Sequence, residues 1–176
     1  MPRFPPPPLC KLRNLTPAAY KNTFVPGTNL AMNNTVVHLY ASFLGNIKQP
    51  DIERLGQYVS EDIHFRDPFN DCVGLDQFRA VLSDMFIHLE SFQFQITDCL
   101  FSEEQQIGYL HWNMAAKSKH LRNKDLDIQG VSQVTFNSEG KVTAHFDYWD
   151  AASGIYEKIP IINFILKKIR KRISST

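Results

Sequence analysis

The stretch LDIQGVSQVTFNSEGKVTAHFDYW, residues 126–149, decides the fold class. Apolar and polar residues alternate on both sides of the polar segment 137–140, which contains Asn137 and Gly140. Alternation with a period of two is typical of a half-buried strand, and a short Asn- and Gly-containing segment between two strands predicts a hairpin. We therefore expect two antiparallel strands, over residues 126–136 and 141–149.

The same alternation continues upstream of this hairpin. Phe92, Phe94 and Ile96 alternate with polar residues directly after Ser91. A further strand is predicted over 107–117, and the polar segment 118–125 forms the turn after it. The pattern indicates a four-stranded antiparallel meander.

Before Ser91 the apolar spacing is helical in three places. One helix is predicted from Asn33 to about Ile47, and a second one opens at Pro50. A short strand over 63–67 follows, and then the clearest helical pattern of the chain, which begins after Gly74. Its apolar residues recur at steps of three and four: Leu75, Phe78, Leu82, Met85 and Leu89. Three helices followed by a meander predict an α+β fold in which the helices cover one face of a curved sheet.

Composition and the two ends of the chain set the domain plan. We expect a flexible, proline-rich extension over residues 1–31, one domain over 32–154 and a basic amphipathic helix over 155–176. A formal net charge of +1 argues against a nucleic-acid binder. The cysteines show no metal-ligand spacing and favour a reducing compartment: Cys10, Cys72 and Cys99. We expect a cytoplasmic protein without a cofactor or metal, with peripheral attachment to the inner membrane surface as an alternative.

The predicted C-terminal helix starts at Pro160. Its apolar stripe consists of Ile162, Ile165, Leu166, Ile169 and Ile173. Its basic residues are Lys167, Lys168, Arg170, Lys171 and Arg172. Such a helix can lie on an anionic membrane surface. The alternative is a helix that packs its stripe on the domain or on a second subunit.

Two groups of motifs resemble a known superfamily. The first group is Asp51-Ile52-Glu53, Phe65-Arg66-Asp67-Pro68-Phe69 and Gly74 before a helix that contains Phe78; the second is the hairpin over 136–142 followed by Tyr148-Trp149. Over roughly residues 33–150 the chain resembles the nuclear transport factor 2-like superfamily, especially its ketosteroid isomerase and SnoaL-like (polyketide cyclase-like) branches, and within them uncharacterised bacterial members. The resemblance implies a cone of three N-terminal helices on a curved antiparallel sheet that encloses a pocket, and a homodimer.

The resemblance also implies roles for single residues. Asp67 falls where ketosteroid isomerases have their general base, a role that needs apolar walls such as Phe65. In the alternative, Asp67 anchors the turn that follows it by accepting backbone hydrogen bonds. The oxyanion-binding tyrosine falls on Phe43, with Tyr40 one helical turn earlier, and the oxyanion-binding aspartate falls on Ser132. This incomplete pair argues against steroid isomerisation.

The last strand adds Asp147 and Trp149 to the expected pocket. Asp147 and Asp67 together would form a carboxylate pair, as in the limonene-epoxide hydrolase branch, whereas the alternative is a salt bridge from Asp147 to a basic side chain: Arg66, Arg79 or His145. Three functions follow as hypotheses. The chain binds a small apolar molecule, or it is an isomerase, cyclase or epoxide hydrolase that uses Asp67 as its base, or it is an adaptor that docks through residues 155–176.

Overall fold

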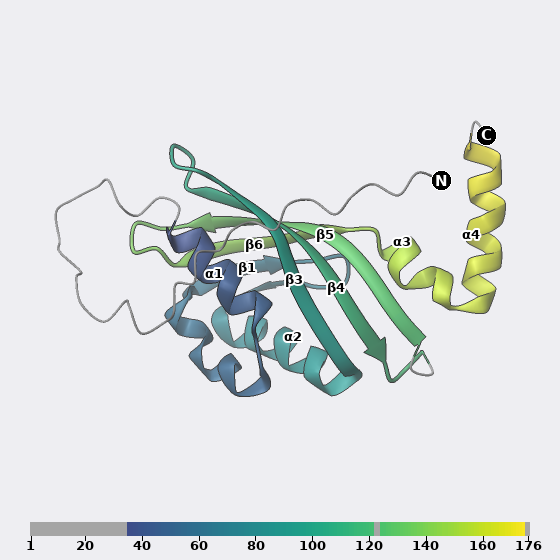
Figure 1. Cartoon of the computed structure of the whole chain (residues 1–176), viewed down its shortest axis with the longest axis horizontal. Coiled ribbons are helices and arrows are strands. Elements are labelled where there is room, and N and C mark those ends of the chain that lie inside the picture. Colours follow the sequence, from purple (N-terminus) through teal and green to yellow (C-terminus); the bar gives the residue numbers. More distant parts are fainter. Residues whose placement is uncertain (1–34, 122–123, 175–176) are drawn as a thin grey trace.

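The computed structural model describes residues 35–121 and 124–174 (Figure 1). The predicted extension over 1–31, and Cys10 within it, lie outside the described residues. The elements before the meander are α1 (Thr35–Gly45), η2 (Gln49–Gln57), β1 (Val59–Arg66), β2 (Asp71–Val73) and α2 (Leu75–His88). The meander and the C-terminal segment comprise β3 (Leu89–Ser102), β4 (Ile107–Ser118), β5 (Lys124–Phe136), β6 (Val142–Trp149), α3 (Ala151–Gly154), η3 (Tyr156–Lys158) and α4 (Pro160–Ile173).

The strands form one curved, six-stranded sheet in the order β2-β1-β6-β5-β4-β3. The predicted meander is present as β3 to β6, whose neighbours pair antiparallel. The predicted short strand is longer than expected and pairs parallel with β6, for example Phe65 with His145. The sheet is therefore mixed rather than purely antiparallel. Apolar alternation identifies strands but does not specify their partners, so this parallel edge was not predictable from the pattern.

The helix predicted from Pro50 is a 3-10 helix, η2, and not an α-helix. Between Thr35 and the meander, in the part of the chain that the structure describes, the α-helices are α1 and α2. The segment has nine residues, with Pro50 at its start and Gly56 near its end, so it has little room for the hydrogen bonds of an α-helix. Its apolar residues are nevertheless placed as expected, because Ile52 and Leu55 are buried.

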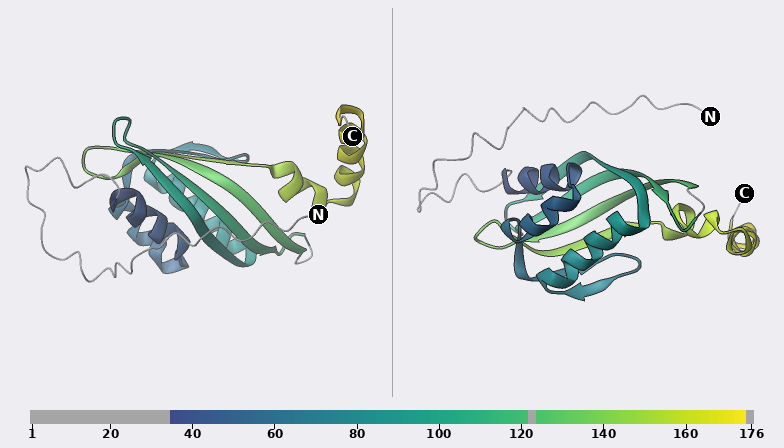
Figure 2. Two further views of the ribbon diagram at one scale, coloured as in Figure 1. Left: turned by 45° about the horizontal axis from the view of Figure 1, so that its top comes forward. Right: turned by 90° about the horizontal axis from the view of Figure 1, so that it is seen from below.

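The elements α1, η2 and α2 cover one face of the sheet (Figure 2). A large apolar core lies between them and the strands, and its most buried side chains include Leu55, Ile63 and Phe78. A second, smaller core lies at the other end of the meander, around Trp112 and Ile128. The site described below lies where these two cores meet.

The chain leaves the sheet after Trp149. Asp150 caps α3 by accepting hydrogen bonds from the backbone N–H groups of Ala152 and Ser153. The predicted helix from Pro160 is present as α4, which projects from the end of the sheet (Figures 1 and 2). Within the described ranges, no helix has the length and apolar character needed to cross a bilayer.

Candidate functional site

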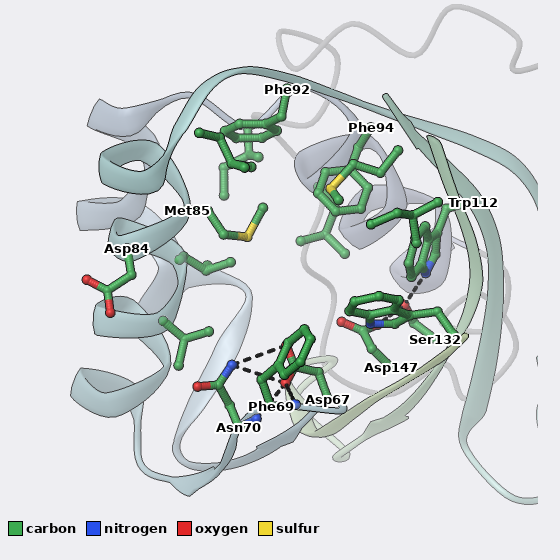
Figure 3. Close-up of a pocket in the computed structure, with 18 of the residues that line it drawn as sticks. Asp67, Phe69, Asn70, Asp84, Met85, Phe92, Phe94, Trp112, Ser132 and Asp147 are labelled. Atoms are coloured by element: carbon green, nitrogen blue, oxygen red, sulfur yellow. Dashed lines mark hydrogen bonds between the residues drawn. The ribbon is translucent and has the colours of Figure 1, made fainter. Parts of the chain in front are cut away.

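A cavity of about 290 Å³ lies between α2 and the concave face of the meander (Figure 3). Leu82 and Met85 line it from α2. Phe92, Phe94 and Trp112 line it from β3 and β4. The alternation predicted for residues 92–97 thus places the two phenylalanine rings on the cavity side. The result is a predominantly apolar hollow rather than a closed core.

A glycine in β5 makes room for one cavity wall. Gly130 pairs with Trp112 across β4 and β5. A Cβ atom on Gly130 would lie 2.3 Å from the Trp112 ring, which is closer than real carbon atoms approach. The missing side chain therefore lets the indole lie flat on β5, and the indole Nε1–H donates to Ser132 Oγ over 2.9 Å.

The polar end of the cavity is built around Asp147. Ser132 Oγ donates to Asp147 Oδ1 over 2.5 Å, and His145 Nε2 lies 2.9 Å from the same oxygen. Ser132 and Asp147 are paired residues of β5 and β6, and His145 is two residues before Asp147 on the same face. All three line the cavity, and the Asp147 side chain keeps 20% exposure.

Tyr40 of α1 holds the other side of the His145 ring. Its hydroxyl lies 2.7 Å from His145 Nδ1, and both side chains are buried. Burial, and after it the negative charge of Asp147, raise the pKa of the Tyr40 phenol well above its ordinary value. The hydroxyl therefore keeps its proton and donates a hydrogen bond to Nδ1 in the His145 tautomer that carries its own proton on Nε2. A neutral imidazole with its proton on Nε2 then satisfies both contacts of His145.

These contacts form one directed array, in which every donor points toward Asp147. Tyr40 donates to His145 and His145 donates to Asp147, while Trp112 donates to Ser132 and Ser132 donates to Asp147. Neutral donors of this kind stabilise a carboxylate and fix its orientation. The array can present an acceptor oxygen to a molecule in the cavity, or receive a proton from it.

Asp67 also lines the cavity, but its own turn occupies its oxygens. Asp67 Oδ1 accepts from the backbone N–H groups of Phe69 (2.8 Å) and Asn70 (2.6 Å). The Asn70 amide donates to both carboxylate oxygens, at 3.1 and 3.2 Å (Figure 3). This is the arrangement that the anchoring alternative predicts. The role of Asp67 as a general base stays a prediction.

The remaining predicted pocket residues divide into two groups. Phe65 and Trp149 line the cavity; the Phe65 ring stacks on Phe78, with centroids 4.7 Å apart. Tyr40 and Phe43 do not line it. Tyr40 lies behind His145, and the Phe43 ring stacks on Tyr58 at 4.2 Å. Helical spacing puts both residues on the inner face of α1, but it does not distinguish the cavity from the surrounding core.

Of the three basic side chains named as alternatives for Asp147, His145 is the one in contact with it, through the 2.9 Å hydrogen bond described above. Arg66 lies over the Phe146 ring, 4.6 Å from its centroid, and Arg79 pairs with Asp76. Sequence reasoning missed Trp112 as a donor in the array. The available signal was Gly130, because a glycine inside a strand marks a close approach by another group.

The sequence profile described as "SnoaL-like domain" matches residues 40–145, more than half of the chain. The chain belongs to the SnoaL-like domain family. No curated protein sequence matches this SnoaL-like chain.

Solved structures with the same fold include proteins with and without an assigned activity. A nuclear transport factor 2-like protein of unknown function from an Exiguobacterium species has 15% identity and a TM-score of 0.57, and the match covers 65% of this chain and 98% of that one. A putative SnoaL-like polyketide cyclase from a Jannaschia species has 9% identity and a TM-score of 0.61, with 72% and 93% covered. An LEH-like epoxide hydrolase from M. tuberculosis has 13% identity and a TM-score of 0.58, with 78% and 98% covered. These structural similarities establish a shared fold, and at identities this low they establish the fold alone.

Proposed function

We propose that this SnoaL-like domain binds a small, largely apolar molecule that carries a hydrogen-bond donor, and that Asp147 accepts that donor. The observation that carries the proposal is the asymmetry of the cavity. Its walls are mostly apolar, whereas Ser132, His145 and Asp147 meet at one end. Ligand sites commonly combine an apolar lining with a few placed polar groups of this kind.

The array restricts the chemistry of the ligand. Both observed donors of the array, Ser132 and His145, bond to Oδ1 of Asp147. A carboxylate accepts several hydrogen bonds, so its second oxygen suits a hydroxyl, amine or amide N–H group. A ligand carboxylate in the same place would meet like charge. The volume of about 290 Å³ fits a compact molecule and is at the lower end for ligand pockets.

The two tryptophans of the chain provide a direct test, because Trp112 and Trp149 both line the cavity. N-phenyl-1-naphthylamine, a neutral and apolar amine, serves as the probe. We expect saturable quenching of tryptophan emission together with a rise in probe emission. Met85→Trp should block binding by filling the cavity, whereas Leu100→Trp, at a side chain with 67% exposure, serves as the matched control. Equal binding by both variants would contradict the proposal.

A second function is favoured by the array itself. A carboxylate fixed by His145 and Ser132 beside an apolar cavity is equipped to take a proton from a carbon or from a water molecule. If the chain is an enzyme of the isomerase, cyclase or epoxide hydrolase type, we propose Asp147 as its base, as an alternative to the predicted Asp67. The support is that the hydrogen bonds of Asp67 come from its own turn, whereas Asp147 is held by side chains.

Limonene epoxide is a suitable first substrate, with diol formation followed by gas chromatography. Loss of a general base typically slows a reaction by about a hundredfold or more. We expect that loss for Asp147→Asn and a change of less than about threefold for Asp67→Asn. A rate equal to that of the buffer alone would exclude hydrolysis of this epoxide.

A further inference from the structure

The apolar side of α4 is uncovered. None of its residues is buried, although half of them are large and apolar. The most exposed are Ile161 (77%), Ile173 (74%), Phe164 (61%), Ile165 (52%) and Ile169 (47%). Exposed apolar surface of this extent marks a contact site rather than an ordinary solvated helix face.

The charge on α4 indicates what the contact partner is. Its sequence PIINFILKKIRKRI contains no acidic residue, and its five basic side chains are exposed. At 100° per residue, Ile165 and Ile169 lie near the middle of the apolar side, and Lys168 lies toward one edge of it. Arg172 lies within the apolar side, in the last turn of the helix. Lys168 Nζ lies 4.6 Å from the Phe164 ring centroid, so its stem runs along apolar surface while the charge stays at the edge. A surface that is apolar at its centre and cationic at its flank complements an anionic bilayer.

The position of α4 leaves this side accessible. The helix projects beyond the end of the sheet and lies apart from α1 and α2 (Figures 1 and 2). Arg170 pairs with Glu157 of η3 and approaches Asp150 at 3.9 Å. One basic residue of α4 therefore anchors the helix to the segment that precedes it. The other four basic side chains are exposed on a helix of 14 residues, which is too short to span a bilayer.

We propose that α4 docks this protein on an anionic lipid surface, with its apolar side in the headgroup region and its flanking cations on lipid phosphates. The apolar side supplies hydrophobic burial and the cations supply electrostatic attraction, the two contributions that interfacial helices combine. Docking through α4 does not depend on the proposed binding of a ligand in the cavity.

The test is co-sedimentation of the full chain with vesicles, either of phosphatidylcholine alone or with about one quarter phosphatidylglycerol. We expect binding to the mixed vesicles only, weakened as salt screens the charges. Lys168→Glu with Arg172→Glu should lower the bound-to-free ratio by at least about tenfold, because each basic residue near an anionic surface contributes several-fold. Ile169→Glu should lower the bound-to-free ratio as well, because it places a charge in the apolar side that enters the headgroup region.

The matched control is Lys48→Glu with Lys117→Glu, which makes the same change in net charge at exposed positions of the body. Its binding should stay within about twofold of the unchanged protein. Equal loss in both double variants would show general charge attraction and overturn the proposal. Absence of vesicle binding, together with a dimer that Ile169→Glu dissociates, would instead identify α4 as a subunit interface and also overturn it.

Discussion

Asp67 and Asp147 line the same cavity, but their hydrogen bonds come from different parts of the chain. The donors to Asp67 are two and three residues away, in the turn that it begins. The donors to Asp147 come from β5 and β6, and behind them stand Tyr40 of α1 and Trp112 of β4. A carboxylate held by its own turn stabilises that turn. A carboxylate held by several elements is positioned with respect to the cavity, and this difference separates an anchoring residue from a site residue.

The largest loss of stability is expected on substitution of His145, the buried donor to Asp147. His145→Ala should lower the free energy of unfolding by about 3 kcal/mol, since it leaves a cavity and removes the partner of the Tyr40 hydroxyl. His64 forms a similar 2.7 Å contact with Asp71, but its side chain is 40% exposed. Its alanine variant should cost less than about 1 kcal/mol. Urea unfolding measures both, and equal losses would contradict a special role for the buried array.

Substitution of Gly130 tests whether the hydrogen bond from Trp112 to Ser132 depends on the close approach of the indole to β5. Gly130→Ala should cost about 2 kcal/mol, because the added carbon overlaps the indole and displaces it. At Gly45 a Cβ atom would lie 3.6 Å from Ile96, an ordinary contact. Gly45→Ala should therefore leave stability unchanged or raise it slightly. A shift in tryptophan emission should accompany the Gly130 change alone.

The two carboxylates themselves should respond in opposite ways. Asp67→Ala removes the acceptor of the turn and should cost about 1 to 2 kcal/mol of stability, with probe binding unchanged. Asp147→Asn keeps an oxygen for Ser132 and His145, so it should cost less than about 1 kcal/mol. Its affinity for a donor-carrying ligand should fall by about tenfold or more. If Asp67→Ala also weakened binding, both carboxylates would contact the ligand.

Substitution of Tyr40 is expected to give the smallest change in the free energy of unfolding, and this change depends on pH. In the unfolded chain the phenol titrates near 10.0, whereas in the folded protein its pKa is well above that value. Above pH 10 the unfolded state therefore binds fewer protons than the folded state, and the free energy of unfolding falls as pH rises. The loss is at most about 1.4 kcal/mol per pH unit. Tyr40→Phe should cost about 1 kcal/mol at neutral pH and lack this alkaline decline. Parallel profiles for both proteins would contradict the raised pKa.

Much of the fold could be predicted from local patterns. The strands expected over 126–136 and 141–149 correspond to β5 and β6 within two residues, and the helix after Gly74 ends at His88, one residue before the predicted Leu89. The parallel pairing of β1 with β6 and the 3-10 form of η2 were not predicted. Pairing depends on how elements far apart in the chain meet, and periodicity carries no such information.

Most members of the site were predictable, with the exception of Trp112, but the hydrogen bonds that connect them were not. Alternation along the last strand places His145 and Asp147 on one face, and Ser132 was identified through the superfamily resemblance, which puts it at the oxyanion-binding position. The contact between Tyr40 and His145 joins residues 105 positions apart, and no local pattern indicates it. By contrast, the anchoring alternative for Asp67 rests on an Asp-Pro turn, which is a local feature, and the observed hydrogen bonds have that form.

Native mass spectrometry of the protein purified from its own host tests the central proposal most directly, with Asp147→Asn and Asp67→Asn prepared in parallel. Our account predicts a small molecule retained by the unchanged protein and by Asp67→Asn, and lost from Asp147→Asn. A molecule that Asp147→Asn retains and Asp67→Asn loses would contradict it.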